Sequence, residues 1–273
     1  MEIITINQKK DKPIGVLDSG LGGLTVVREF EHLLPAENLI YFGDNANCPY
    51  GNRSKEEILE LTFAMLDFLQ DKDVKIVMIA CNTISTLIDK LRQPYKFPIV
   101  SIIETACEHI ASLGLEQIGI FATEFTVKQG LYERNINKLS PETMVFSQPS
   151  SNLAILIDNG RFHDPAIKPE VQALLSGIMQ TAPDLKNIVL ACTHYPIVQE
   201  IFEQTVPDIT FINPANVQVQ AVRTILSGLD LLSEREDSQS HLDIYTSGEK
   251  QQYEAAIKKL TINRPLTIYA KTL

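Results

Sequence analysis

The chain has 273 residues, of which 44% are hydrophobic and 21% charged, so it can hold one or two packed domains and wholesale disorder is excluded. Its net charge of −10 and sequence pI of about 5.0 disfavour nucleic acid and anionic lipid as partners. In addition, no apolar run approaches the ~18 residues of a membrane-spanning helix. From the charge and the absence of such a run, we expect neither a nucleic-acid nor a membrane partner.

Short apolar, β-branched runs alternate along the chain with amphipathic stretches of helical length. The predicted strands are 13–17, 39–42, 76–80, 99–102, 117–121, 144–147, 187–191, 210–212 and 243–246. The predicted helices include 22–33, 55–72, 83–93, 127–138, 165–181 and 196–205. This alternation predicts an α/β fold with parallel sheets covered by helices on both faces, and it places any ligand beyond the C-terminal ends of the strands.

The two halves of the chain repeat one pattern. In the first, a strand closes at Asp18 and a later strand ends at Cys81; in the second, the equivalent positions are Thr123 and Cys192. The separations are similar, 81 − 18 = 63 and 192 − 123 = 69. The pattern predicts two similar α/β domains facing each other across a cleft, and chance resemblance between generic strand ends is the alternative.

The four cysteines are far apart, and residues 1–12 lack the apolar segment of a signal peptide, so we expect a cytoplasmic protein without disulfides. Cys81 and Cys192 each follow an apolar strand and precede a predicted helix start, where a thiol's ordinary pKa of about 8.5 falls and some thiolate is available. The alternative is two inert buried cysteines. Cys48 lies beside the Pro49-Tyr50-Gly51 turn and could approach a ligand pocket, but we expect it to be a packing residue and Cys107 an ordinary helix residue.

Two opposed thiols suit the inversion of a stereocentre, because a thiolate can remove a proton from one face while a thiol supplies one to the other. A zinc site is a competing hypothesis, but the spacing of Cys192 and His194 is not that of zinc ligands. A hydrolase with one cysteine nucleophile leaves the second cysteine unused.

Asp18 and His194 adjoin these cysteines, and either could assist proton transfer. The local alternatives are a capping aspartate and a core histidine. Gly20, Gly22 and Gly23 do not match a nucleotide-binding loop; we expect them to let the strand turn tightly and bring bare N–H groups to a small anion.

Five segments, in this order, resemble the motifs of the glutamate racemases of the aspartate/glutamate racemase superfamily: Asp18-Ser19-Gly20-Leu21-Gly22-Gly23-Leu24-Thr25, Tyr41-Phe42-Gly43-Asp44, Pro49-Tyr50-Gly51, Ala80-Cys81-Asn82-Thr83 and Cys192-Thr193-His194-Tyr195-Pro196. The resemblance covers almost the whole chain. It implies two domains, 1–104 plus 215–273 and 105–214, with the active site between them.

The resemblance also implies an isomerase that interconverts L- and D-glutamate and supplies D-glutamate for peptidoglycan synthesis, cell-wall biogenesis and cell shape. Cys81 and Cys192 would be the two acid/base thiols, assisted by Asp18 and His194. The residues implied to line the glutamate pocket are Ser19, Pro49, Tyr50, Gly51, Asn82, Thr83, Thr126 and Thr193, with Thr123 and Asp158 as further candidates. No cofactor or metal is implied, and relatives suggest a homodimer.

Three segments depart from the family pattern. Ala122-Thr123-Glu124-Phe125-Thr126 lacks two glycines of a Gly-Thr-x-Gly-Thr motif, Asp158 replaces a glutamate, and Asn45 and Asn47 replace threonine and arginine. These changes leave racemisation of aspartate or another amino acid as an alternative. A non-catalytic amino-acid-binding regulator is a second alternative, although binding alone does not need two thiols.

Overall fold

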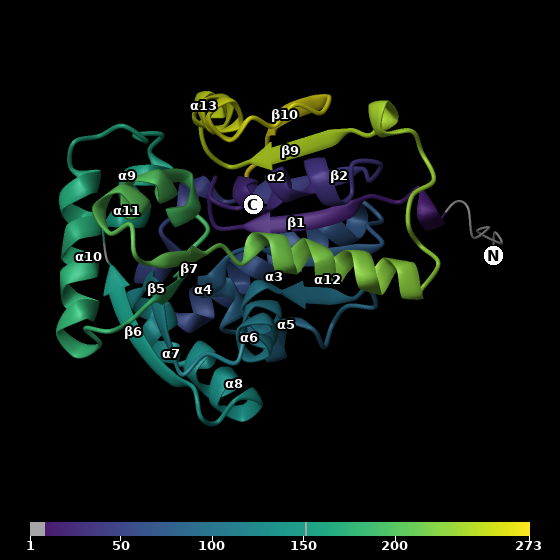
Figure 1. Ribbon diagram of the computed structural model, residues 1–273. Coiled ribbons are helices and arrows are strands. Elements are labelled where there is room, and N and C mark those ends of the chain that lie inside the picture. Colours follow the sequence, from purple (N-terminus) through teal and green to yellow (C-terminus); the bar gives the residue numbers. More distant parts are fainter. Residues whose placement is uncertain (1–8, 151) are drawn as a thin grey trace.

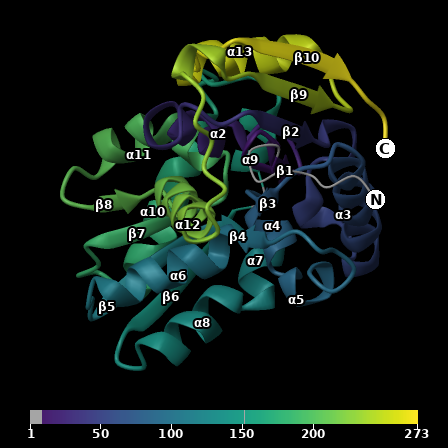
Figure 2. The ribbon, with the colours of Figure 1, turned by 90° about the vertical axis from the view of Figure 1, so that its right-hand side faces the viewer.

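Two all-parallel β-sheets organise the chain in the computed structural model, which describes residues 9–150 and 152–273 (Figures 1 and 2). The first sheet has the order β10-β9-β2-β1-β3-β4 and the second β6-β5-β7-β8. The strands of the first sheet are β1 (Ile14–Asp18), β2 (Leu39–Gly43), β3 (Ile76–Ile79), β4 (Ile99–Ser101), β9 (Leu242–Thr246) and β10 (Leu266–Ala270). Those of the second are β5 (Gln117–Thr123), β6 (Met144–Ser150), β7 (Asn187–Ala191) and β8 (Thr210–Ile212).

The sheets are flanked by helices, as the alternating pattern predicts. The α-helices are α2 (Leu24–Leu33), α3 (Lys55–Asp71), α4 (Asn82–Ser85), α5 (Ile88–Leu91), α6 (Ile102–Ser112), α7 (Glu124–Gln129), α8 (Leu131–Leu139), α9 (Leu153–Asp158), α10 (Ile167–Thr181), α11 (Gln199–Thr205), α12 (Ala215–Gly228) and α13 (Lys250–Leu260). Among the described residues, no helix combines the length and apolar character that crossing a membrane requires.

Both faces of the first sheet are buried, which explains why its central strands are apolar up to their C-terminal ends. Val16 and Met78 pack in the cluster that contains α2 and α12, whereas Leu17 and Val77 pack in the cluster that contains α3 and α5. Successive side chains of a strand point to opposite faces, so a strand covered on both sides must be apolar at every position.

The internal repeat is present in the topology of the two sheets. β1 lies between β2 and β3, with β4 beyond β3; β5 lies between β6 and β7, with β8 beyond β7. The strands that precede Cys81 and Cys192 therefore occupy equivalent places in two similar parallel sheets. The predicted fold class, two similar parallel-sheet α/β domains, is confirmed.

Local backbone features divide two of the predicted helices. The segment 83–93 forms α4 and α5, separated by a break at Thr86 and Leu87. The segment 127–138 begins earlier, at Glu124, and breaks at Gly130, whose φ of +62° is left-handed. Strand β10 was not predicted, because its residues are only partly buried at the sheet edge.

The chain crosses from the first sheet to the second through α6 and returns through α12 (Figure 2). These two helices pack against each other. The predicted domain boundary at 104 falls inside α6, and the division into 1–104 plus 215–273 and 105–214 stays a prediction. The signal-peptide prediction rests largely on residues 1–8, which lie outside the described residues.

Candidate active site

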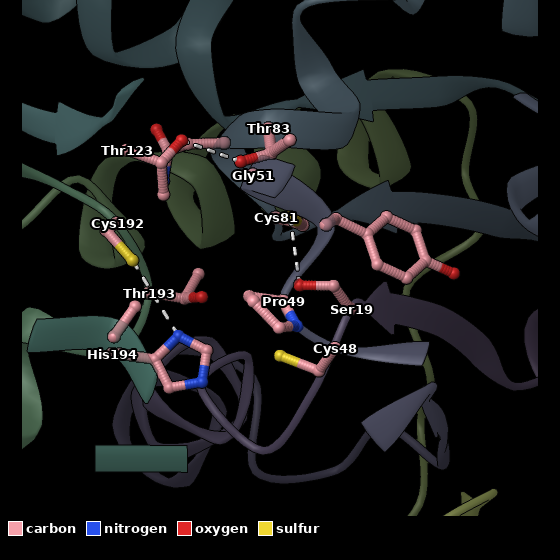
Figure 3. A pocket seen from close by; sticks show the side chains of 13 residues that line it. Ser19, Cys48, Pro49, Gly51, Cys81, Thr83, Thr123, Cys192, Thr193 and His194 are labelled. Carbon is pink, nitrogen blue, oxygen red and sulfur yellow. Dashed lines mark hydrogen bonds between the residues drawn. The ribbon is translucent and has the colours of Figure 1, made fainter. Parts of the chain in front are cut away.

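A small pocket lies beyond the C-terminal ends of β1, β3, β5 and β7 (Figure 3). Its empty volume is about 330 Å³. Its lining residues come from both sheets: Ser19, Cys48, Pro49, Tyr50, Gly51, Cys81, Asn82, Thr83, Thr123, Ala154, Cys192, Thr193 and His194. Figure 3 shows Cys192 and Cys81 in different parts of this wall, Cys192 next to His194 and Cys81 next to Ser19.

Cys81 lies two residues beyond the end of β3, at the N-cap position of the single helical turn α4. Its Sγ lies 3.4 Å from Ser19 Oγ. Burial, together with the charge of nearby Asp18, raises the pKa of the Cys81 thiol to about 12, although the Ser19 hydroxyl opposes this effect. The predicted lowering of this pKa was therefore wrong: one helical turn contributes little dipole, and desolvation outweighs it.

Cys192 follows β7 and belongs to a chain of polar contacts. Its Sγ lies 3.7 Å from Nδ1 of His194, and Nε2 of His194 lies 2.7 Å from the Asp158 carboxylate. Burial disfavours the charged imidazole, but the hydrogen bonds to Asp158 and Cys192 outweigh it and hold the pKa of His194 well above its usual range. The imidazolium form places a positive charge beside the Cys192 sulfur.

Asp158, the last residue of α9, is held by groups from both halves. Besides His194, its carboxylate accepts hydrogen bonds from the Leu21 backbone N–H at 3.0 Å and from Asn45 Nδ2 at 2.9 Å. The glycine-containing loop therefore does present a bare N–H group to an anion, and that anion is Asp158. Burial raises the pKa of this carboxyl, but the contacts with His194 and the loop lower it by more, and the net direction is downward.

Asp18 ends β1 and is fully buried behind the pocket wall. Thr193 Oγ1 donates to it at 3.1 Å and the Gly20 N–H at 3.0 Å. Burial raises the pKa of Asp18 to about 6, although the charge of His194 acts in the opposite direction. The two cysteines thus have different surroundings, a carboxylate near Cys81 and an imidazolium beside Cys192.

Hydroxyl and amide groups form the wall near Cys81. Thr83 Oγ1 lies 3.0 Å from Thr123 Oγ1 and 3.4 Å from Thr126 Oγ1. Asn82 Oδ1 accepts a hydrogen bond from the Tyr132 hydroxyl at 2.8 Å, whereas its Nδ2 is buried without a partner in the described part of the chain. An unpaired amide at a pocket wall is well suited to bind an acceptor such as a carboxylate.

The structure brings most of the predicted site residues to this pocket, while three of them, Asp18, Thr126 and Asp158, lie behind its lining as hydrogen-bonding partners. Sequence reasoning missed Ala154, which lines the pocket, and Tyr132, which orients Asn82. Cys48 was expected to pack, although its place beside the Pro49-Tyr50-Gly51 turn left an approach to the pocket open, and it lines the pocket.

One group of potential metal ligands occurs among the described residues. Cys48, Asp158 and His194 each offer one ligand atom, and these atoms lie within 4.8 Å of one another. Sulfur, nitrogen and oxygen donors of this kind suit zinc. However, His194 and Asp158 already hydrogen-bond each other, so a metal would compete with that contact.

Residues 14–222 match the family model described as Asp/Glu/Hydantoin racemase. A glutamate racemase from Bacillus cereus is 34% identical over 241 residues, which is 87% of this chain and 89% of the relative. A glutamate racemase isoform from Bacillus anthracis is 29% identical with a TM-score of 0.86, covering 95% of this chain and 98% of that one. A glutamate racemase from Francisella tularensis, solved with D-glutamate, is 27% identical with a TM-score of 0.84, covering 96% and 98%.

Proposed function

This chain belongs to the Asp/Glu/hydantoin racemase family, and we propose that it is a cofactor-independent glutamate racemase using Cys81 and Cys192 as its acid and base. One observation carries the proposal: two thiols at equivalent strand ends of two similar sheets line the same small pocket. The names of the similar proteins support glutamate as the substrate.

In the proposed reaction, the Cys192 thiolate removes the α-proton from one face of the amino acid. The Cys81 thiol then donates its proton to the opposite face of the resulting carbanion. The product leaves the enzyme with a thiol at Cys192 and a thiolate at Cys81, the form that acts on the other enantiomer. The imidazolium of His194 supports the first form, and the raised pKa of Cys81 is consistent with a thiol there.

The pocket wall would hold the substrate without a lysine or arginine. We propose that the unpaired Nδ2 of Asn82 and the hydroxyls of Thr83 and Thr193 bind its carboxylates, in line with their burial and their place in the wall. Ser19, Thr123 and the Pro49-Tyr50-Gly51 turn would complete the pocket. Asp18, Thr126 and Asp158 would act from behind it.

The biological setting is proposed from the family resemblance alone. A glutamate racemase would supply D-glutamate for peptidoglycan synthesis and thereby for cell-wall biogenesis and cell shape. We propose a cytoplasmic location and a homodimer on the same basis.

The proposal is tested by incubating the protein with L-glutamate in D₂O without added cofactor. Circular dichroism follows loss of optical activity, and NMR follows loss of the α-proton signal. We expect both signals to decay with the wild type and neither to decay with Cys81→Ser or Cys192→Ser. Cys107→Ala, which removes a buried thiol that lies outside the pocket, is the matched control and should remain active.

Folded wild-type protein that left both signals unchanged would refute the proposal. L-aspartate is run in parallel, and faster conversion of aspartate would replace glutamate as the substrate. A rise in melting temperature with glutamate, without isotope exchange, would favour the amino-acid-binding regulator instead.

A further inference from the structure

Asn45 makes contacts in two directions from the turn after β2. Its Nδ2 donates to Asp158 Oδ2 at 2.9 Å. Its Oδ1 accepts from the Tyr253 hydroxyl and, at 3.5 Å, from Thr246 Oγ1. An amide oxygen only accepts and an amide nitrogen only donates, so the two hydroxyls fix the orientation of the amide and turn its donor towards Asp158.

Asp158 depends on such contacts for its position. Its Oδ1 accepts from His194 and from the Leu21 N–H, whereas Asn45 binds Oδ2. The carboxylate is partly exposed, 13% for the side chain, so apolar packing does not enclose it. Without Asn45 the carboxylate can rotate about its last bond and weaken its hydrogen bond to the His194 ring.

The contact between Asn45 and Asp158 leads to only one of the two thiols. His194 adjoins Cys192, and the described hydrogen bonds connect Cys81 to Ser19 instead. The series Tyr253, Asn45, Asp158, His194 therefore ends at Cys192 only. It also joins the two halves, because Asn45 and Tyr253 follow strands of the first sheet, β2 and β9, whereas Asp158 and His194 follow strands of the second, β6 and β7.

We propose that Asn45 is a positioning residue that orients His194, through Asp158, for proton transfer at Cys192. This inference rests on the proposed racemase function. It assigns a role to one of the positions at which the chain departs from the family pattern. Because Asn45 acts on one side of the reaction, its loss slows proton transfer at Cys192 and leaves transfer at Cys81 unchanged.

Deuterium at the α-carbon separates the two sides. Enantiomers have equal free energies, so any loss in kcat/KM is the same in both directions. The isotope effect on kcat/KM, in contrast, can differ between the two directions. For the enantiomer that loses its deuterium to Cys192, a slower Cys192 step makes that transfer more rate-limiting, and the isotope effect rises. For the other enantiomer, deuterium is lost to Cys81 in a step that is now less rate-limiting, and the isotope effect falls.

The experiment measures racemisation of α-deuterated L- and D-glutamate by the wild type, Asn45→Ala and Asn45→Asp. Loss of one hydrogen bond to a charged group predicts a fall in kcat/KM of about 10- to 100-fold. Asn45→Asp keeps the shape and both hydroxyl contacts but replaces the amide donor with a second carboxylate oxygen, which repels Asp158 or shares a proton with it. It therefore disturbs Asp158 even if the alanine variant fails to fold. Asn47→Ala is the control for a loosened turn, because Asn47 Nδ2 donates to Asp44 and not to Asp158.

We expect the two isotope effects to diverge in both Asn45 variants and to stay at the wild-type values in Asn47→Ala. Isotope effects that move together, or variants as active as Asn47→Ala, would overturn the inference while the wild type still racemises glutamate. A wild type that does not racemise glutamate would overturn the proposed function, and this inference with it.

Discussion

Gly20 lies so close to Asp158 that adding one carbon atom tests the arrangement of the site. A Cβ at this position would lie 2.3 Å from Asp158 Oδ1, and ordinary van der Waals contact begins at 3.4 Å, so a shift of 3.4 − 2.3 = 1.1 Å is required. The atom that must move is the acceptor for both His194 and the Leu21 N–H. A misplacement of about 1 Å near reacting groups can cost about 100-fold in rate, so we expect kcat of Gly20→Ala to fall by about that factor.

The assay is racemisation followed by circular dichroism at saturating glutamate, with thermal unfolding of the same samples. Gly228→Ala is the control, because an added Cβ at Gly228 meets nothing within 4 Å. A folded Gly20→Ala variant with kcat within about twofold of Gly228→Ala would show that the position of Asp158 does not govern the reaction.

Three further predictions concern groups behind the pocket and in the core. Because burial raises the pKa of Asp18 to about 6, the folded state binds this proton more tightly than the unfolded chain, and the free energy of unfolding falls as pH rises from about 4 to 6. Asp18→Asn should remove this loss: in urea titrations its free energy of unfolding should exceed that of the wild type by up to about 3 kcal/mol at pH 7, but not below pH 4. The same variant should lose activity. Glu37→Gln should destabilise the fold by about 3–5 kcal/mol, because it leaves the buried Lys75 ammonium, now 2.6 Å from Glu37, without a counter-charge; an unchanged urea midpoint would contradict this. Tyr132→Phe releases the Asn82 amide and should raise KM for glutamate by about tenfold with a smaller change in kcat; a pure kcat effect would argue against a binding role for this amide.

The elements that were predicted correctly are those whose limits are visible in the local sequence. The strands β7 and β8 were placed to the residue, and β1 to within one residue at each end; for β1 and β7 the buried apolar run has clear limits. The helix predicted over 83–93 was wrong in its continuity, because the break at Leu87 is a backbone feature that apolar periodicity does not encode. Strand β10 is partly exposed and gives no comparable apolar signal.

The candidate site divides in the same way. Cys81 and Cys192 were identified because each lies in a short motif at a strand end. Tyr132 and Tyr253 were not, because they reach Asn82 and Asn45 from 50 and 208 residues away, and no local pattern marks such pairs. The pKa of Cys81 was predicted in the wrong direction for a related reason: its burial is a property of the assembled core rather than of the adjacent helical turn.

The unequal surroundings of the two cysteines have a consequence for the free enzyme. A proton on Cys81 with a thiolate at Cys192 and the reverse arrangement differ in energy, since one thiol has Asp18 nearby and the other His194. Each turnover of the proposed reaction exchanges one arrangement for the other, so the thiol that carries the proton in the free enzyme depends on which enantiomer was last released. At high substrate flux, the return of the free enzyme to its preferred protonation state by proton exchange with water would become a separate step of the cycle.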